Sequence, residues 1–344
     1  LGVSKYHSLL QASTATAGNL FRLGGHEAPP SITSVYLGSA LTELLSRLDQ
    51  ADVSLPDRGP MDLGLAKLPS IIPYDSDRNR TAPVAFTGDK FEFRAPGASQ
   101  SIALPVTMFA SLWAWGVQQM TDMIEERSSG GKDPMDVALD AVKEAVRRGG
   151  DVLFEGDAYS REWHEEARKR GLIQAGDMPG KIDLLLLPEN KKMLEELGVF
   201  HEHELEALHD IRMEAFVRSL EIEVAILYDM LWEGILPALS KQLILEKNSL
   251  SALDGMEFPE GEPWREYILG LGRTRAALIE DAHRLNELRG RMAELPVRER
   301  ADFLVGTAIP LMDSIRRRCD AAEVNMAADI WPYPISRNLL SLSV

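Results

Sequence analysis

Cysteine is nearly absent from this chain, which has a single one, Cys319, in 344 residues. One cysteine excludes an internal disulfide and any zinc site built from several cysteines. It fits a reducing compartment, so we expect a cytoplasmic protein in which Cys319 is a buried helix residue.

Positive charge is also scarce. Lys and Arg total 37 against 53 Asp and Glu, which gives a net charge of −16. A chain this acidic repels phosphate backbones and anionic lipid surfaces, so we expect neither nucleic acid nor a membrane as a partner.

Long apolar runs and the common nucleotide motifs are missing as well. The most apolar candidate, "SIALPVTMFASLWAWGV", is interrupted by Pro105 and polar residues, and it predicts no membrane span. The sequence contains no Walker loop, no dinucleotide fingerprint and no Gly-x-Ser-x-Gly elbow. It opens in amphipathic sequence, "KYHSLLQASTATAG", without a signal pattern, and we therefore expect the chain to start within a longer protein.

The spacing of turn residues and apolar residues predicts an α+β fold in two parts. Gly and Pro punctuate residues 1–115, where we expect helices over 4–17 and 32–49 and a strand at "KFEFR", in a sheet that is antiparallel. Residues 116–330 are predicted as a helical domain, and 331–344 as an extended tail that packs back on the body. From about residue 100 onward we expect helices over 100–127, 134–148, 159–170, 188–197, 202–218, 220–247, 262–294 and 297–324.

The last two predicted helices form a long antiparallel hairpin. Leu271, Leu278, Leu285 and Met292 recur every seven residues, the pattern of a helix packed along a neighbour. The connection to the next helix is short, so the two run antiparallel, and Pro310 is expected to disturb the second one.

The stretch around "KFEFR" is the first candidate site. In a strand, Phe91 and Phe93 face one side while Lys90, Glu92 and Arg94 face the other. A carboxylate flanked by two cations could hold a divalent metal while the cations hold anionic oxygens. The alternative is an ordinary amphipathic strand whose charges lie in solvent.

Two flanking segments add charge to this candidate. Arg78 and Arg80 precede the strand and favour a local anion site, unless they are solvated loop arginines. In "FRLGGHEAPP" the Gly and Pro residues predict a flap, where Arg22 and Glu27 could meet the carboxylate and ammonium of a zwitterion. An ordinary Gly/Pro loop is the alternative.

The remaining polar clusters favour no site. His201, His203 and His209 lie near acidic residues without the spacing of a zinc site, and they fit a solvated helix start. The arginines at 316–318 lie near the end of a helix and fit a surface position.

Taken in order, several segments resemble one family. "RLGGHEAPPSITSVYLG", "DRNRTAPVAFTGDKFEFRAPG", "VLFEGDAYSREWHEEARKRGL" and "ILPAL" are similar to the C-terminal part of the catalytic domain, and to the helical C-terminal domain, of type III glutamine synthetases. The resemblance spans essentially the whole chain. It implies ligation of ammonium to L-glutamate in nitrogen assimilation, using ATP and Mg²⁺ (or Mn²⁺), through a γ-glutamyl phosphate intermediate.

The resemblance also implies roles for individual residues. Glu27 resembles the flap glutamate that closes over the site and helps to deprotonate ammonium. Arg22 and Arg94 resemble the arginines that bind glutamate, and Arg80 resembles the arginine that stabilises phosphoryl transfer and contacts the nucleotide.

Two further roles concern nucleotide and metal. Lys90 lies where the wider family has a cation against nucleotide phosphate, and Glu92 resembles a metal-ligand carboxylate. The family's other metal carboxylates lie upstream, so we expect this chain to be the downstream portion of an enzyme that assembles in homo-oligomeric rings. Two alternatives stay open: a related carboxylate–amine ligase with another substrate, and a non-catalytic assembly or regulatory protein.

Overall fold

The computed structural model describes residues 1–23, 32–48, 82–128, 133–172, 175–252 and 261–335. It divides into two compact units, Leu1–Arg212 and Met213–Val344. Within the described part no helix is both long and apolar enough to cross a membrane.

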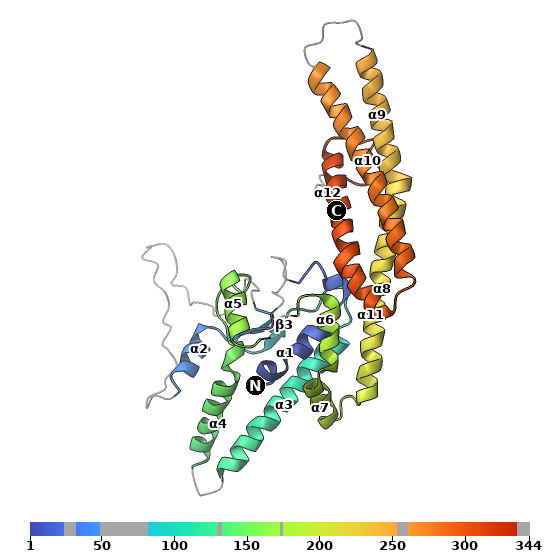
Figure 1. Ribbon diagram of the computed structural model, residues 1–344. Helices are drawn as coiled ribbons and strands as arrows, with labels where there is room; N and C mark the ends of the chain where they lie inside the picture. The colour runs from blue at the N-terminus through green and yellow to red at the C-terminus, as the bar shows by residue number, and fades with distance from the viewer. Residues whose placement is uncertain (24–31, 49–81, 129–132, 173–174, 253–260, 336–344) are drawn as a thin grey trace, which may run out of the picture. The chain divides into compact units, whose positions relative to one another are not determined.

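The first unit combines a small sheet with helices (Figure 1). Its described elements, in chain order, are α1 (Gly2–Ser13), η1 (Ala17–Asn19), β1 (Val35–Tyr36), α2 (Ser39–Ser46), β2 (Val84–Phe86), β3 (Phe91–Phe93), α3 (Ala103–Ser128), α4 (Pro134–Gly149), η2 (Gly150–Val152), α5 (Arg161–Lys169), α6 (Met178–Asp183), η3 (Leu184–Leu186), α7 (Pro188–Glu196) and the start of α8 (Glu202–Asp229).

The predicted α+β class is confirmed, but the described sheet is mixed and not antiparallel throughout. β1 runs parallel to β2, with Val35 opposite Val84, whereas β2 and β3 form an antiparallel hairpin with Ala85 opposite Glu92. The helix that we expect over 32–49 is shorter in the structure. Val35 is paired with Val84 in the sheet, so α2 begins only at Ser39.

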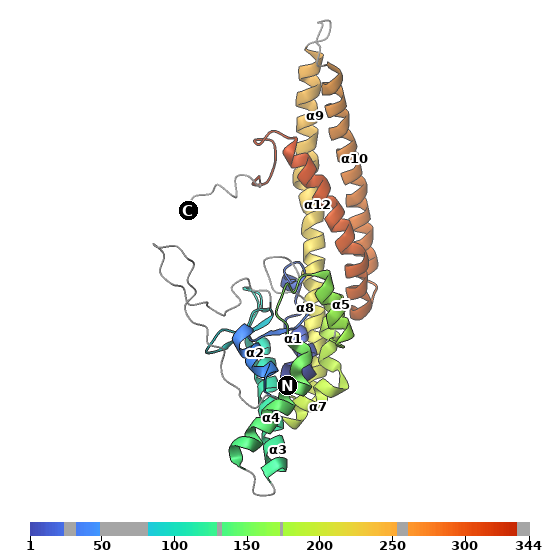
Figure 2. The ribbon, with the colours of Figure 1, turned by 90° about the vertical axis from the view of Figure 1, so that its left-hand side faces the viewer.

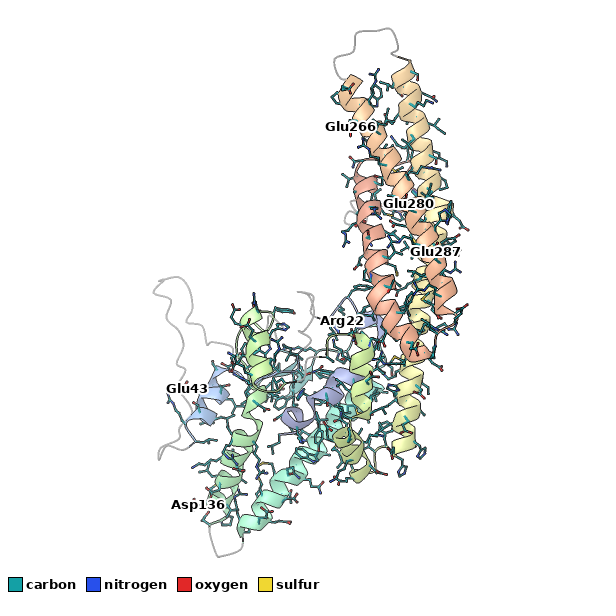
Figure 3. The ribbon with its side chains drawn as sticks, in the orientation of Figure 1. Arg22, Glu43, Asp136, Glu266, Glu280 and Glu287 are labelled. Atoms are coloured by element: carbon teal, nitrogen blue, oxygen red, sulfur yellow. The ribbon has the colours of Figure 1, made fainter. Side chains whose placement is uncertain are left out.

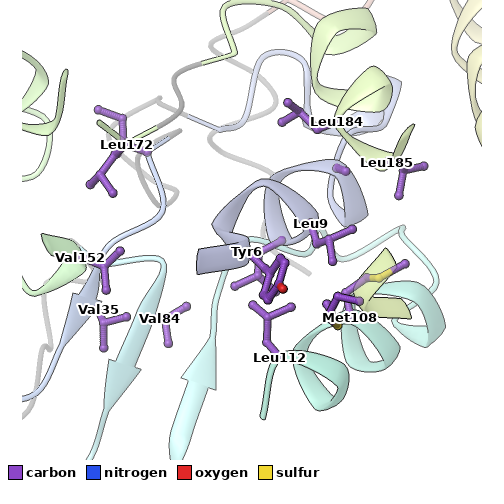
Figure 4. Packing of buried hydrophobic residues seen from close by; sticks show 14 of the residues in the cluster. Tyr6, Leu9, Val35, Val84, Met108, Leu112, Val152, Leu172, Leu184 and Leu185 are labelled. Carbon is purple, nitrogen blue, oxygen red and sulfur yellow. The ribbon is translucent and has the colours of Figure 1, made fainter. Parts of the chain in front are cut away.

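The core of the first unit surrounds α1. Leu9, Leu10 and Ala12 of this helix have no exposed surface, and the polar residues Ser8 and Gln11 are buried beside them. Figure 4 shows side chains of α1, α3, β1 and β2 in one cluster, among them Tyr6, Leu112 and Val84. The sheet is therefore fixed against α1 and α3 through its apolar face.

Side-chain caps and prolines mark several helix starts. Ser160 accepts a hydrogen bond from the backbone N–H of Trp163 and caps α5. Asp133 caps α4 in the same way, and proline is the first residue of α4 and of α7, where its missing N–H costs nothing. The short helix α6, capped by Asp177, was not predicted.

The second unit is helical. It contains the end of α8 followed by η4 (Met230–Ile235), α9 (Leu236–Ser251), α10 (Gly261–Met292), α11 (Val297–Phe303), η5 (Leu304–Ala308) and α12 (Ile309–Val324). The expected break between helices near residue 219 is wrong, because α8 continues through the π-helical turn η4 into α9. The turn η5 precedes Pro310 just as η4 precedes Pro237, and a proline without an N–H explains both wide turns.

The predicted heptad seam is confirmed. Leu271, Leu278, Leu285 and Met292 are all buried. Helix α10 packs against α12, as expected for the hairpin, and also against α9; both neighbours lie along it in Figures 1 and 2. The tail returns to the unit at Trp331, which is buried, and at Tyr333, whose hydroxyl donates to the carbonyl of Met230 (3.3 Å).

Candidate active site

The β2–β3 hairpin separates an apolar face from a charged one. The ring of Phe93 stacks on Phe109 of α3 at a centroid distance of 5.9 Å, and Phe91 meets the edge of Trp113 at 5.7 Å. Strand residues alternate between faces, so Glu92 and Arg94 project away from α3. The predicted two-sided strand is thus confirmed.

Glu92 and Arg94 form an ion pair on the charged face. Arg94 donates from Nε to Glu92 Oε2 at 3.1 Å; the Arg94 side chain is 12% exposed and that of Glu92 40%. The Arg94 backbone N–H donates to the carbonyl of Pro83 at 2.9 Å, which fixes the residue to the neighbouring strand. A mostly buried guanidinium held in this way is suited to binding a planar carboxylate or phosphate.

Lys90 directly precedes β3, as Arg94 directly follows it. The Thr87 N–H donates to the Lys90 carbonyl at 2.9 Å and closes the hairpin, which Gly88 allows with its φ of 96°. The Lys90 ammonium contacts Asp89 at 3.1 Å and its side chain is 61% exposed. Of the two cations that flank the strand, Arg94 is therefore the one whose ion pair is with Glu92.

Arg22, labelled in Figure 3, joins the charged face from a distant part of the sequence. It follows η1 and donates from Nε to Asn19 Oδ1 (3.0 Å) and from a terminal nitrogen to the carbonyl of Ala95 (2.6 Å). Ala95 directly follows Arg94. The structure therefore brings Arg22, Glu92 and Arg94, three of the predicted site residues, to one end of β3.

Several predicted residues lie outside the described part of the chain. These are the flap glutamate Glu27, and Arg78 and Arg80 of the turn before β2. Their positions stay predictions.

Glu92 is the one predicted metal ligand that the structure places. An exposed carboxylate oxygen fits Mg²⁺, which uses one or two carboxylates together with substrate phosphates. Within the described ranges no three His, Cys, Asp or Glu residues are close enough together to hold a metal ion. Glu92 could contribute to a metal site there but does not form one with described neighbours.

Sequence reasoning missed three polar residues beside this site. Asn19 is fully buried and bonds Arg22, and Gln100 bonds Asn19 at 3.3 Å. Lys181, 6% exposed, lines a small cavity with Phe93 and Ala95, and burial lowers the pKa of its ammonium. Neither amide carries a charge or a motif that could have singled it out, and Lys181 stands beside the apolar run "LLLL" as an isolated cation.

An apolar cavity of about 490 Å³ lies on the opposite face of the sheet. Val84, Phe91, Trp113 and Ile124 line it, with other apolar residues and no charged one. Such a lining suits neither a nucleotide nor a zwitterion. Of the three histidines expected at a solvated helix start, His201 and His203 are exposed. The expectation is wrong for His209, whose side chain is 13% exposed and contacts Asp183 at 2.9 Å.

Comparison with known proteins first relates one part of the chain to a family. Residues 138–251 match the family described as "Glutamine synthetase C-terminal domain". This match covers helices of the chain and does not include β3 or Arg22.

The relatives are named more narrowly. The chain is 30% identical to a "Type-3 glutamine synthetase" of Dictyostelium discoideum, over 99% of this chain and 47% of that protein. It is 29% identical to a "Glutamine synthetase" of Bacteroides fragilis (strain YCH46), over 98% of this chain and 48% of that protein. The resemblance to type III glutamine synthetases is thereby confirmed, and the chain spans about half the length of these relatives.

Proposed function

We propose that this chain is part of an enzyme that ligates ammonium to L-glutamate with ATP, giving L-glutamine through γ-glutamyl phosphate. One observation carries the proposal beyond family likeness. Arg22, which follows η1, donates to the carbonyl of the residue after Arg94, and Arg94 pairs with Glu92, so that these three residues gather at one end of β3.

These two arginines are proposed to bind glutamate. A guanidinium recognises a carboxylate by parallel N–H donors, and here each guanidinium is already held by protein acceptors, Asn19 and Ala95 for Arg22 and Glu92 for Arg94. Because both guanidinium groups are already held in place, they need not reorient when glutamate binds, and the carboxylates of glutamate are then bound in one fixed orientation.

The chemistry then needs phosphoryl transfer and amide formation. The γ-phosphoryl group of ATP passes to the side-chain carboxylate of glutamate, with Arg80 and Lys90 proposed to face the phosphates. Glu27 accepts one proton from ammonium, and the resulting ammonia attacks the acyl phosphate carbon. The C–N bond forms, the C–O bond to phosphate breaks, and the nitrogen gives its second surplus proton to the leaving phosphate. Closure of the flap over residues 22–30 would keep water from the acyl phosphate.

Glu92 is proposed to hold Mg²⁺ or Mn²⁺, which when bound would neutralise charge on the phosphoryl oxygens. Among the described residues Glu92 belongs to no cluster of three possible metal ligands, so we propose that the other ligands come from residues outside the described part or from substrate phosphates. This supports the proposal that the chain is the downstream portion of a longer synthetase.

Domain limits, assembly and location are proposed on the same basis. We assign 1–115 to the catalytic domain, 116–330 to the helical domain and 331–344 to the tail; the geometric division at Arg212 groups the first helices of that domain with the sheet. Homo-oligomeric rings are proposed from the family. The buried free thiol of Cys319 supports a reducing, cytoplasmic location.

The test is phosphate release from ATP by the enzyme at its natural length, supplied with glutamate, ammonium and Mg²⁺. Turnover should require both glutamate and ammonium, and Arg94→Ala should lower kcat/KM for glutamate by about 100-fold, the value of one or two charged hydrogen bonds. Arg316→Ala is the matched control, because it removes an exposed arginine that pairs with Asp320 on the same helix.

Other outcomes separate the alternatives. Turnover with a different carboxylate or amine, still lost in Arg94→Ala, would identify a related ligase. A folded enzyme that turns over none of these substrates would contradict the proposal and favour a non-catalytic role.

A further inference from the structure

A buried amide connects Arg22 to the rest of the first unit. Asn19, the last residue of η1, has no exposed surface. Its Oδ1 accepts from Arg22 Nε at 3.0 Å, and its Nδ2 donates to the carbonyl of Thr14 at 2.7 Å. The same Nδ2 lies 3.4 Å from the carbonyl of Ala95, which also accepts from Arg22. One side chain therefore touches the end of α1, the end of β3 and the arginine between them.

The partners of Asn19 demand both halves of an amide. Arginine can only donate, so the group facing Arg22 must accept. Backbone carbonyls can only accept, so the group facing Thr14 and Ala95 must donate. An aspartate here would accept from Arg22 but would place a carboxylate oxygen against the two backbone carbonyls. A leucine of similar size would neither accept from Arg22 nor donate to the carbonyls. The chemistry of this position is thus fixed by its neighbours.

A second amide extends the network. Gln100 donates to the carbonyl of Ser13 at 2.7 Å, and its Oε1 lies 3.3 Å from Asn19 Nδ2 and 3.4 Å from the N–H of Gly97. Gly97 passes so close that a Cβ there would lie 3.0 Å from Asn19 Oδ1 and 3.5 Å from Arg22 Nε. The segment after β3 is held against η1 with little space to shift.

We infer that Asn19 is a positioning residue for substrate binding: it orients Arg22 and ties it to the backbone segment that follows Arg94. This inference rests on the proposed function for the identity of the ligand, a dicarboxylic amino acid. The orientation of Arg22 is a separate property and can be measured without turnover.

The experiment uses the enzyme at its natural length and compares Asn19→Leu with Asn190→Leu. Asn190 is equally buried, donating to Ser8 Oγ (3.0 Å) and to the carbonyl of Leu184 (2.7 Å), and it shares no partner with Asn19. Each variant loses a fully buried amide, so a general loss of stability affects both.

Two readouts follow. Phenylglyoxal modification of Arg22, followed by peptide mass spectrometry, should be several-fold faster in Asn19→Leu and unchanged in Asn190→Leu, because a guanidinium released from its acceptors is more accessible. The KM for glutamate should rise about tenfold in Asn19→Leu, equivalent to about 1.4 kcal/mol of binding, with a much smaller change in kcat.

Asn19→Asp separates the acceptor from the donor. It keeps an oxygen toward Arg22 Nε, so Arg22 should stay protected from phenylglyoxal, while the carboxylate opposing two carbonyls lowers the melting temperature. Should Asn19→Leu fail to fold, Asn19→Ser replaces it, since a serine hydroxyl is too short to reach Arg22.

An unchanged modification rate of Arg22 in Asn19→Leu would overturn the inference, whatever the kinetics. So would a KM shift of equal size in Asn190→Leu. If the unmodified enzyme has no activity with glutamate, the proposed function fails, and the modification rates still decide whether Asn19 orients Arg22.

Discussion

The second unit contains a buried ion pair whose contribution to stability can be predicted. Asp281 of α10 is 3% exposed and accepts a hydrogen bond from Arg318 of α12, which is 40% exposed. Arg284 lies farther from the carboxylate, at 3.6 Å, and is 65% exposed. Substituting Arg318→Met keeps most of the side-chain volume and removes the closest positive charge from a carboxylate that has almost no access to water.

The cost follows from burial. Removing one partner of a buried pair costs about 3–5 kcal/mol, because the remaining charge is left without compensation. Arg318 is partly exposed and Arg284 remains nearby, so we expect the lower end, about 3 kcal/mol, or a fall in melting temperature of roughly 10 °C. The double substitution Asp281→Leu and Arg318→Met removes both charges and should restore most of that loss.

Urea denaturation of the four species in this cycle measures the effect. The matched control is Arg316→Met on the same helix, whose pair with Asp320 is exposed and should contribute no more than about 0.5 kcal/mol. The reasoning is refuted if Arg318→Met costs no more than Arg316→Met. It is refuted equally if the double variant loses the sum of the two single losses.

Two further predictions concern buried titratable groups. Burial lowers the pKa of the Lys181 ammonium in the folded protein. At pH values below that lowered pKa, keeping the lysine protonated in a buried place reduces the free energy of unfolding. This penalty disappears as the pH rises from the lowered pKa to the usual lysine pKa. Lys181→Met should therefore raise the free energy of unfolding by about 1 kcal/mol at pH 7 and by less at pH 10, measured by urea denaturation, and an equal gain at both pH values would contradict this. Burial raises the pKa of the Cys319 thiol to about 12, so iodoacetamide at pH 8 should label the denatured protein and leave the native protein almost unlabelled. A native labelling rate within tenfold of the denatured one would show that the thiol is accessible.

The parts of the fold that sequence predicted were those with an unbroken period. The seven-residue repeat from Leu271 to Met292 predicted the packed face of α10, and the two-residue alternation of Phe91 and Phe93 predicted a strand with one apolar face. A regular spacing of apolar residues indicates which side of a helix or strand is buried, and in α10 and β3 that burial determines the secondary structure.

Sequence failed where a distant partner decided the local structure. Val35 lies in a helical pattern of leucines, yet it pairs with Val84, a residue 49 positions away by number, and the helix starts later. The predicted break near residue 219 had no proline or glycine to cause it, and the helix continues. Local spacing contains no information about either outcome.

The same limit applies to the candidate site. Arg94 was predicted from the two-residue alternation around β3, and Arg22 from its place beside the Gly and Pro residues of the predicted flap. Asn19 and Gln100 could not be predicted, since an amide in a loop has no distinguishing pattern until its donors and acceptors are placed. The alternation also could not decide that Lys90 contacts Asp89 while Arg94 contacts Glu92.

The two π-helical turns have a consequence for how relatives of this chain should be aligned. A π turn accommodates one more residue than an α-helical turn of the same length, so each one resets the angular phase of the helix that follows it. Val224 and Leu239 lie on opposite sides of η4, and both are buried. The number of residues between them differs from the spacing that an uninterrupted heptad repeat would give two buried positions. A relative without the proline after this turn can omit one residue there and still bury the same helix face. A one-residue gap at η4 or η5 in an alignment would then mean that a π turn is replaced by an α-helical turn, with the helix otherwise intact.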